Sequence, residues 1–595
     1  MAIYRSDQAQ LTFAAETAQG ADSEMGYGTA GSGDTTINAD FSAGSRSITV
    51  ANGTAFQVGD TIRIGTALST EASSVNEYEL RKIEAIQVPA SGTTRTFELD
   101  RATAFFHASG QEVKEVTEIG GTALGQSQGK YITFIPGVYE TIDTPDPEMS
   151  IEGRRFLNTT SKRNWNIAYP GQQTLSGSIG SFTLLNGWAL RFPIGSVVTT
   201  PASTSGTKFS GNLSVAAKKG DIYITLDGTS NLGNGDYINI DDGSATLSEV
   251  RRVVANPSGN VVKLNYPLQF DHGTVSVDEC TGAASYTHSI VEKADLDTVT
   301  WNVHMLPSDE DSDKAFNRRY LGGMVDSSTI SAEEGGMVTM SWDGVNFLDM
   351  IHNQASQTTV GTNLYNGSSV AHNMPRYSLS QSITATDVGE PSHNGASVND
   401  GTGFPTTQPY YFSEGTIKFF GQEFARIRSF SLSISNGSEP RYYIGKQGRR
   451  RRGPYEIKEG PREYSMSATV ALPDASVDSN AAHGSASQDG ALELFRQLLL
   501  EGDYGSDSAP NRKGFTATIK FERGADDHII IDIPTSGTVG DPSDANDIGS
   551  GLNNQGIMIN TATHSITTDN PFQVDVDMIF RSIKITVKDT QPVYP

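Results

Sequence analysis

The densest cluster of charge in the sequence is the run Arg449, Arg450, Arg451 and Arg452. Four adjacent guanidinium groups could bind the phosphates of a nucleic acid or act as a nuclear-localisation signal. The same run could also lie in a solvated loop without any ligand. The choice between these interpretations depends on the elements that carry the run.

Two histidines, His107 and His272, stand at matching places in two similar segments of the chain. Histidine could act there as a metal ligand or as a base. No cluster of Cys, His or carboxylate residues accompanies either histidine in the sequence, and a metal or acid–base site would need one. We therefore favour structural histidines that close a hairpin.

Motifs for catalysis and for bound ions are incomplete in this chain. The segment Asp309–Asp313 resembles the start of a calcium loop, but Lys314 and Tyr320 occupy the positions where an EF-hand has Gly and Glu. The pair Gly129-Lys130 lacks the flanking residues of a phosphate-binding loop. We predict a protein that is not an enzyme and that has no cofactor and no metal ion. The paired carboxylates of a glycoside hydrolase leave no sequence signature, so that class stays open.

Composition narrows the remaining classes. Of the 595 residues, 61 are Gly and only 19% are charged, which favours many short strands over long helices. The net charge of −25 argues against a general nucleic-acid binder, because such a protein needs a basic face. The single cysteine, Cys280, excludes an internal disulfide. The sequence has no apolar run of ~18 residues and no signal-peptide core, so we expect no membrane segment and a cytosol-like compartment.

Alternation of polar and apolar residues is the main secondary-structure signal. Ser429–Ser435 and Val574–Met578 alternate without a break, which indicates strands with one buried face and one wet face. Helical patterns occur only near residues 184–192, ended by Gly195, and at residues 491–500. The fold class predicted from these patterns is mostly β.

Two short segments of the chain repeat each other. Gly59-Asp60 and Gly235-Asp236 each separate two alternating runs, which is a hairpin signal. Further along, Leu99, Phe105 and His107 match Leu264, Phe270 and His272 at identical spacing. We predict two copies of one small β module, at residues 45–117 and 210–283.

A larger and fainter repeat emerges when these modules are set aside. Glu152-Gly153-Arg154-Arg155 in the first half matches Gln447-Gly448-Arg449-Arg450 in the second half. An alternating strand and a helical pattern follow in both cases, and residues 323–331 resemble residues 557–565. The shared order predicts a duplicated β domain with the small modules inserted into the first copy only.

This organisation resembles the major tail tube protein of long-tailed (siphovirus-like) bacterial or archaeal viruses. The resemblance rests on Leu11–Gly20, on residues 132–195, on Tyr411–Phe419 and on the closing strands to Val587. It implies two tandem tail-tube-like β-sandwich domains, each with a flanking helix, plus the two small inserted β modules. The first domain would comprise residues 1–44, 118–209 and 284–365, the modules residues 45–117 and 210–283, and the second domain residues 376–595.

The family implies a structural virion protein that self-assembles into stacked rings and forms the tail tube, the conduit for genome ejection. A duplicated chain would close a pseudo-hexameric ring as a homotrimer. The implied partners are further copies of the chain, the tail terminator and tail tip proteins, the tape measure protein, and viral double-stranded DNA that passes through the lumen without specific binding. No membrane is involved. The protein would be assembled in the host cytoplasm and reside in the virion tail.

Charge bears on this expectation in two ways. A negative lumen would repel DNA phosphates, so we expect an excess of Asp and Glu on the wet faces of the lumen strands. The family also uses the loop with the Gly-Arg-Arg sequence for contacts between rings. The resemblance thus adds a third interpretation of Arg154, Arg155 and the Arg449–Arg452 run, as inter-ring contacts that orient stacking. We favour it over a solvated loop, and both over a nucleic-acid site.

Two other function classes are alternatives to the tube. The Gly-rich, β-rich composition also suits a carbohydrate-binding or carbohydrate-cleaving virion adhesin, such as a tail spike or fibre. A cell-surface layer protein would need an export signal. The duplicated strand–loop–helix unit favours the tube, because ring closure by neighbouring sheets removes exposed strand edges.

Overall fold

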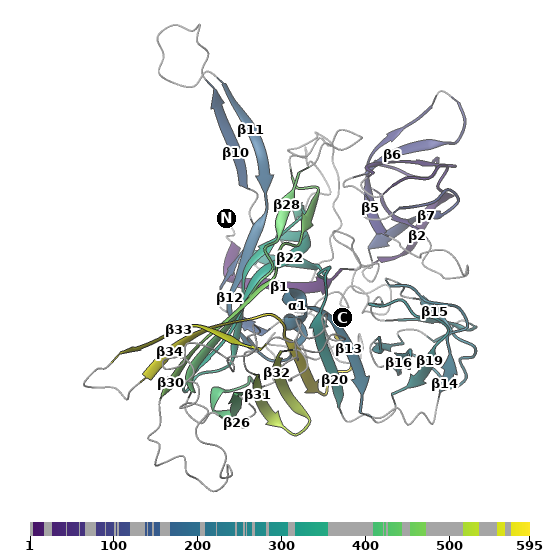
Figure 1. Ribbon diagram of the computed structural model, residues 1–595. Helices are drawn as coiled ribbons and strands as arrows, with labels where there is room; N and C mark the ends of the chain where they lie inside the picture. The colour runs from purple at the N-terminus through teal and green to yellow at the C-terminus, as the bar shows by residue number, and fades with distance from the viewer. Residues whose placement is uncertain are drawn as a thin grey trace, which may run out of the picture.

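The computed structural model of the chain consists of packed sheets with smaller lobes beside them (Figure 1). Strands dominate the described residues, which confirms the predicted mostly β class. The structure describes residues 4–16, 27–42, 45–58, 60–65, 79–89, 91–99, 103, 106–118, 137–139, 141–145, 148–154, 167–202, 209–219, 221, 223–243, 247–253, 256–257, 259–264, 268–280, 285–307, 316–354, 408–419, 422–423, 427–442, 453–471, 516–534, 556–565 and 573–594.

One large antiparallel sheet, here called the shared sheet, runs through both halves of the chain. In spatial order its strands are β33 (Met558–Ser565), β34 (Gln573–Phe580), β30 (Glu463–Ala471), β27 (Ile427–Ser435), β22 (Phe316–Glu333), β23 (Thr339–Asn346), β12 (Ser176–Leu184) and β8 (Gly137–Tyr139). The short strand β9 (Ile142–Asp143) also pairs with β12.

The strand order within the shared sheet repeats. From the outer edge inward, β33, β34, β30 and β27 are the third, fourth, second and first strands of the second half. β22, β23, β12 and β8 follow in the same order for the first half. The two sets meet where β22 pairs with β27, from Ser327 opposite Ser435 to Glu333 opposite Ser429.

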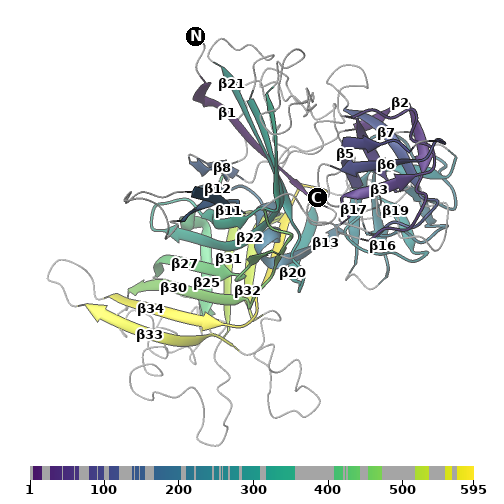
Figure 2. The ribbon, with the colours of Figure 1, turned by 90° about the horizontal axis from the view of Figure 1, so that it is seen from above.

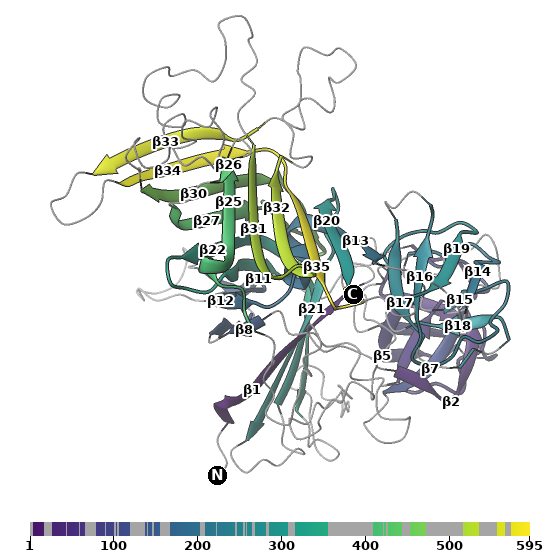
Figure 3. The same ribbon diagram turned by 90° about the horizontal axis from the view of Figure 1, so that it is seen from below.

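β22 is long because it belongs to two sheets. Its second part lies in the shared sheet, and its first part, from Phe316 to Leu321, pairs with β24 (Asp349–Gln354). β21 (Val299–Pro307) pairs with β22 on one side and with β1 (Tyr4–Ala15) on the other. These strands project from the body, with the N-terminus at their far end (Figures 2 and 3).

A second sheet covers the apolar face of the shared sheet. Its strands are β13 (Gly195–Pro201), β20 (Tyr286–Glu292), β35 (Lys584–Asp589), β32 (Asp527–Ile533), β31 (Ala517–Gly524), β25 (Gly415–Phe419) and β26 (Gln422–Glu423). A short 3₁₀ turn, Phe412–Glu414, precedes β25. Alternate residues of both sheets, such as Leu432 and Ile531, form one continuous buried core. Two sheets packed face to face make a β-sandwich, here built from both halves of the chain.

The helical segment expected near residues 184–192 is shorter than its pattern indicates. Leu184 is the last residue of β12, and helical structure begins only with the 3₁₀ turn Trp188–Leu190 and continues in α1, Arg191–Ile194. The Asn186 side chain accepts a 2.9 Å hydrogen bond from the backbone N–H of Trp188, which stops the strand and starts the turn. The segment ends at Gly195, where a Cβ would lie 2.4 Å from the carbonyl oxygen of Val291. The helix expected at residues 491–500 lies outside the described residues.

The first module forms its own sheet and core. Its sheet contains β2 (Tyr27–Thr36), β7 (Glu112–Glu118), β4 (Thr61–Ile64), β5 (Glu79–Gln87), β6 (Arg95–Leu99) and β3 (Ser47–Val50). β2 lies before residue 45, the boundary expected from the repeat, and it belongs to this sheet because it pairs with β7.

The second module has two small sheets around another core. They contain β14 (Ser210–Asn212), β19 (Ser276–Glu279), β16 (Tyr237–Asp241) and β17 (Glu249–Arg252), and β15 (Tyr223–Thr225) with β18 (Val261–Lys263). The two modules lie together beside the sandwich, one above the other in Figure 1 and overlapping in Figures 2 and 3.

Both modules use the repeated residues in the same way. The Asp60 carboxylate accepts a hydrogen bond from the N–H of Gln57 at 2.6 Å, and Asp236 accepts one from Gly233 at 2.8 Å. His107 and His272 are buried and exchange backbone hydrogen bonds with Phe41 and Ala217. The two histidines thus close each module, as expected of structural residues.

Candidate assembly surfaces

The outer edges of the shared sheet are the first candidate surface. Within the described residues, no strand pairs with the outer edge of β33 or with the outer edges of β8 and β9. An unpaired strand edge presents N–H and C=O groups that can pair with another chain. The two edges carry the same two kinds of strand that meet at the β22–β27 junction, since β33 is a third strand and β8 with β9 are a first strand.

The wet face of the shared sheet is acidic and rich in hydroxyl groups. Its strand segments 327–333, 339–346, 427–435, 463–471 and 573–580 contain five carboxylates and one basic residue, Arg428. Arg428 forms an ion pair with Glu334 at 2.9 Å. The five acids are Glu333, Asp343, Glu463, Asp575 and Asp577. The alternation that buries Phe430 and Leu432 turns these acids and the serines to solvent.

Hydroxyl donors hold the carboxylates on this face. Asp343 accepts hydrogen bonds from Thr329 at 2.8 Å and from Ser341 at 2.7 Å. Asp575 accepts one from Thr469 at 2.8 Å, and Asp577 one from Thr561 at 2.7 Å. Threonine and serine keep the acids in place without neutralising them, so the face retains its negative charge.

Two hairpins rise from one end of the sandwich and carry the basic sequences. One is formed by β10 (Glu148–Arg154) and β11 (Ile167–Thr174), the other by β28 (Glu439–Arg441) and β29 (Glu456–Lys458). Both point the same way in Figure 1, and the Tyr442 hydroxyl donates a 3.0 Å hydrogen bond to the carbonyl of Gln173 between them. Each hairpin connects a first strand of the shared sheet to a second strand, β9 to β12 or β27 to β30.

The structure locates the basic residues only in part. Arg154 is the last residue of β10, at the far end of the first hairpin. Arg155 and the run from Arg449 to Arg452 lie outside the described residues. In the sequence, both Gly-Arg-Arg segments stand between the two strands of a hairpin or at the end of its first strand.

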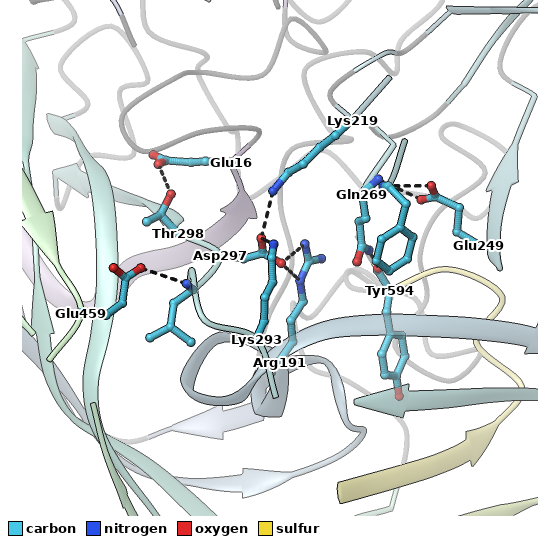
Figure 4. A network of polar contacts seen from close by, with 12 residues as sticks. Glu16, Arg191, Lys219, Glu249, Gln269, Lys293, Asp297, Thr298, Glu459 and Tyr594 are labelled. Carbon is cyan, nitrogen blue, oxygen red and sulfur yellow. Dashed lines mark hydrogen bonds and ion pairs between the residues drawn. The ribbon is translucent and has the colours of Figure 1, made fainter. Parts of the chain in front are cut away.

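A buried ionic cluster joins the second module to the sandwich (Figure 4). Asp297 accepts hydrogen bonds from Arg191 of α1 at 3.1 and 2.9 Å. It also pairs with Lys293 at 3.2 Å and with Lys219 of the second module at 3.5 Å. Burial alone would raise the pKa of Asp297, but the positive charges of Arg191, Lys219 and Lys293 hold it well below its usual range.

The end of the chain completes this joint. The Tyr594 hydroxyl donates to Asp589, and its ring stacks on His288 with 3.7 Å between centroids. The carbonyl of Tyr594 accepts a 2.9 Å hydrogen bond from the Gln269 side chain of the second module. Sequence reasoning missed Asp297 and Tyr594, because their partners are distant in sequence and no local pattern marks them.

Within the second module, Glu249 is the acceptor at the centre of a smaller buried cluster. It bonds His272 at 2.7 Å and pairs with Arg251 at 2.5 Å. Burial would raise the pKa of Glu249, but the charge of Arg251 and the hydrogen bond from His272 lower it. Both carboxylate oxygens of Glu249 are tied to partners in the chain, so the cluster is built as a structural core.

Among the residues that the structure describes, no three or more His, Cys, Asp or Glu side chains gather so that they could hold a metal ion. The acidic segment Asp309–Asp313 lies outside the described residues. No helix of the described part is long and apolar enough to cross a membrane.

A known protein family matches the central part of the chain. A family model for phage tail tube protein matches residues 168–545, which is more than half of the chain. The match includes the junction of β22 with β27 and both strands of the β31–β32 hairpin. No curated protein matches the chain.

Proposed function

The chain belongs to the phage tail tube protein family, and from this premise we propose that it self-assembles into stacked rings that form the tube of a long-tailed (siphovirus-like) virus. As a member of this family it is a structural protein of the virion tail. The proposal adds that the tube conducts the genome during ejection. It also adds that the chain arose by duplication of one tail-tube domain.

The repeated strand order of the shared sheet carries this proposal. Within the chain, the third strand of the first half, β22, pairs with the first strand of the second half, β27. The same kind of pairing between β33 of one copy and β8 with β9 of the next would continue the sheet. Three copies, each with two strand sets, would then close a pseudo-hexameric ring without free edges.

The wet face of the shared sheet becomes the lumen in this ring. Its five carboxylates and single ion-paired arginine give the wall a negative charge. DNA phosphates are repelled by such a surface, so the genome slides past it without binding. The expected excess of Asp and Glu on lumen strands agrees with this face.

The hairpins suit contacts between stacked rings. Both rise from one end of the sandwich (Figure 1), so in a ring all their tips would face the next ring. Arg154, Arg155 and the Arg449–Arg452 run would then meet the adjacent ring and orient stacking by charge. Tail terminator, tail tip and tape measure proteins would meet the ends and the lumen of the same tube.

The domain organisation is part of the proposal. The first domain expected from the sequence comprises residues 1–44, 118–209 and 284–365, but β2 within it pairs with β7 of the first module. The second domain comprises residues 376–595, and the modules at 45–117 and 210–283 interrupt the first. Both modules lie to one side of the sandwich (Figure 3), which suits a decoration of the outer tube surface.

Electron microscopy of the purified chain tests the function, and light scattering tests the ring. We expect stacked rings with a central hole and, at low concentration, a species of three times the chain mass. A species of six chain masses with a hole would refute the duplicated trimer but keep the tube. Isolated particles without a hole at every concentration would refute the tube itself.

A further inference from the structure

The second hairpin covers an apolar patch at the junction of the two halves. Ile457 of β29 is only 2% exposed and packs with Leu296, Met324 and Leu348, which all come from the first half of the chain. Met324 is also 2% exposed. The contact therefore seals the β22–β27 junction at the base of the hairpin.

The first hairpin has a similar residue with no such cover. Ile151 of β10 is 64% exposed. It stands opposite Pro170, so each hairpin has one Ile–Pro pair across its strands, with Ile in the first strand here and in the second strand of the other hairpin. A two-stranded hairpin cannot bury an apolar side chain by itself, and exposed apolar groups of this kind mark contact surfaces.

The free edge of the shared sheet offers the matching surface. Met558 in β33 corresponds to Met324 in β22, because residues 557–565 resemble residues 323–331. Met324 stands opposite Asn346, and Met558 stands opposite Ile579. Ile579 is 50% exposed on the wet face, and Met558 is half-buried. The second half thus exposes an apolar pair where the first half has a covered methionine.

A polar contact of the internal junction has a counterpart as well. The Asp326 carboxylate accepts a 2.9 Å hydrogen bond from the Ser438 hydroxyl, at the turn that leads into the second hairpin. The matching residue of β33 is Asn560, which is exposed and keeps a side-chain oxygen that can accept a hydrogen bond. The free edge of β33 therefore has an apolar residue, Met558, and a hydrogen-bond acceptor, Asn560, at the positions that Met324 and Asp326 occupy at the internal junction.

We propose that the base of the β10–β11 hairpin packs onto Met558 and Ile579 of a second copy of this chain, with Ile151 as the central apolar contact. This inference rests on the proposed function, because it needs a neighbouring copy placed as the second half is placed beside the first. It assigns the hairpin two contacts: its base seals the side-to-side seam within a ring, and its tip faces the next ring.

Paired cysteines test the contact directly. In the double variant Ile151→Cys with Met558→Cys, oxidation or a short bis-maleimide linker should join separate chains into covalent dimers and trimers. Ile457→Cys with Met324→Cys is the positive control, since it should cross-link within one chain. Val88→Cys with Met558→Cys is the negative control, because Val88 is an exposed residue of the first module. The native Cys280 will not interfere, as burial and the nearby Glu279 and Asp278 raise the pKa of its thiol to about 12.

The outcomes separate this inference from the proposed function. Covalent trimers from the double variant, and from neither single variant, would support the contact. Rings visible by microscopy without any cross-link would overturn the contact and leave the tube function standing. Failure of the unmodified chain to form rings would overturn both.

A matched pair of substitutions gives a second readout. Ile151→Asp should abolish ring formation at concentrations where the unmodified chain assembles, while the circular dichroism spectrum of the chain stays unchanged. Ile457→Asp should instead destabilise the isolated chain, because its contact is internal. Normal ring formation by Ile151→Asp would contradict the proposed contact.

Discussion

The backbone N–H of Gly187 donates a 2.9 Å hydrogen bond to the hydroxyl of Tyr594, which lies 407 positions later in the chain. The same hydroxyl donates to the buried Asp589, and the Tyr594 carbonyl accepts from Gln269 of the second module. One residue near the end of the chain therefore contacts the segment after β12, the second sheet and the second module. This position makes the closing residues part of the joint.

Removal of the Tyr594 hydroxyl should destabilise the folded chain. Tyr594→Phe removes the acceptor of the buried Gly187 N–H and the donor to one oxygen of the buried Asp589 carboxylate, which costs about 1–3 kcal/mol. Urea unfolding at neutral pH measures this loss. The control is Tyr169→Phe on the exposed first hairpin, which should leave the free energy of unfolding unchanged. Equal stability of Tyr594→Phe and the unmodified chain would show that the hydrogen bonds contribute nothing net.

Loss of the Asp297 charge should destabilise the joint more strongly. Asp297→Asn leaves Arg191 buried without its counter-charge, and breaking a buried ion pair costs about 3–5 kcal/mol. Proteolysis should also cut between the second module and the sandwich more readily in this variant, because Lys219 loses its partner. An unchanged unfolding midpoint would exclude Asp297 as the main anchor.

The same carboxylate predicts an acid dependence of stability. Its folded-state pKa is lowered, so its contribution is fully present above the unfolded pKa of about 4 and is lost as pH falls through the lower folded value. The unmodified chain should lose stability below about pH 4. Asp297→Asn should lose less over that range, because it lacks this group. Parallel pH profiles of the two proteins would contradict the assignment.

Reversal of the charge on the wet face should make the tube retain DNA. The triple variant Asp343→Lys, Asp575→Lys and Asp577→Lys replaces exposed side chains, so folding and ring formation should persist. Assembled tubes of this variant should bind double-stranded DNA at low salt and release it as salt rises. The matched control carries Asn at the same positions and should bind DNA weakly or not at all. DNA binding by the unmodified tube would contradict a repulsive lumen.

Substitution of the arginine run should affect stacking more than ring closure. A variant with Ser at Arg449, Arg450, Arg451 and Arg452 should form rings but yield shorter tubes by electron microscopy. The variant with Lys at all four positions keeps the charge and should restore much of the length. Tubes of normal length in the serine variant would leave the run as a solvated loop.

Short-range sequence patterns correctly predicted the strands and indicated the two small modules, because neighbouring residues determine these features. The alternation in Ser429–Ser435 identified a strand with a polar and an apolar face, and β27 has both. The repeated Gly-Asp turns and histidines marked two modules, because the same short-range bonds recur in each. The acidic excess of the chain did not reveal which face carries it, since only pairing across strands brings Asp343 and Asp577 onto one surface.

Features that depend on residues far apart in the chain could not be predicted from the sequence. The helical pattern expected from residue 184 includes Leu184, which is the last, buried residue of strand β12. Leu184 fits an apolar position in a strand and in a helix alike, so the pattern could not separate the two. Asp297 draws its three cations from α1, from the second module and from the end of β20. No spacing within one segment could indicate that combination.

The two strand sets of the shared sheet belong to one chain. This covalent link affects how a ring would nucleate and which docking sites it would present to other tail proteins. In the proposed ring, the three β22–β27 junctions lie within single chains, so they form at any protein concentration. Only the three contacts between chains depend on concentration. The junction within a chain and the junction between chains can also differ in sequence. Met324 packs beneath Ile457 at the first, whereas Met558 lies opposite Ile579 at the second. A cap protein docking on the end of such a tube would meet two alternating types of site and would need threefold matching to fit.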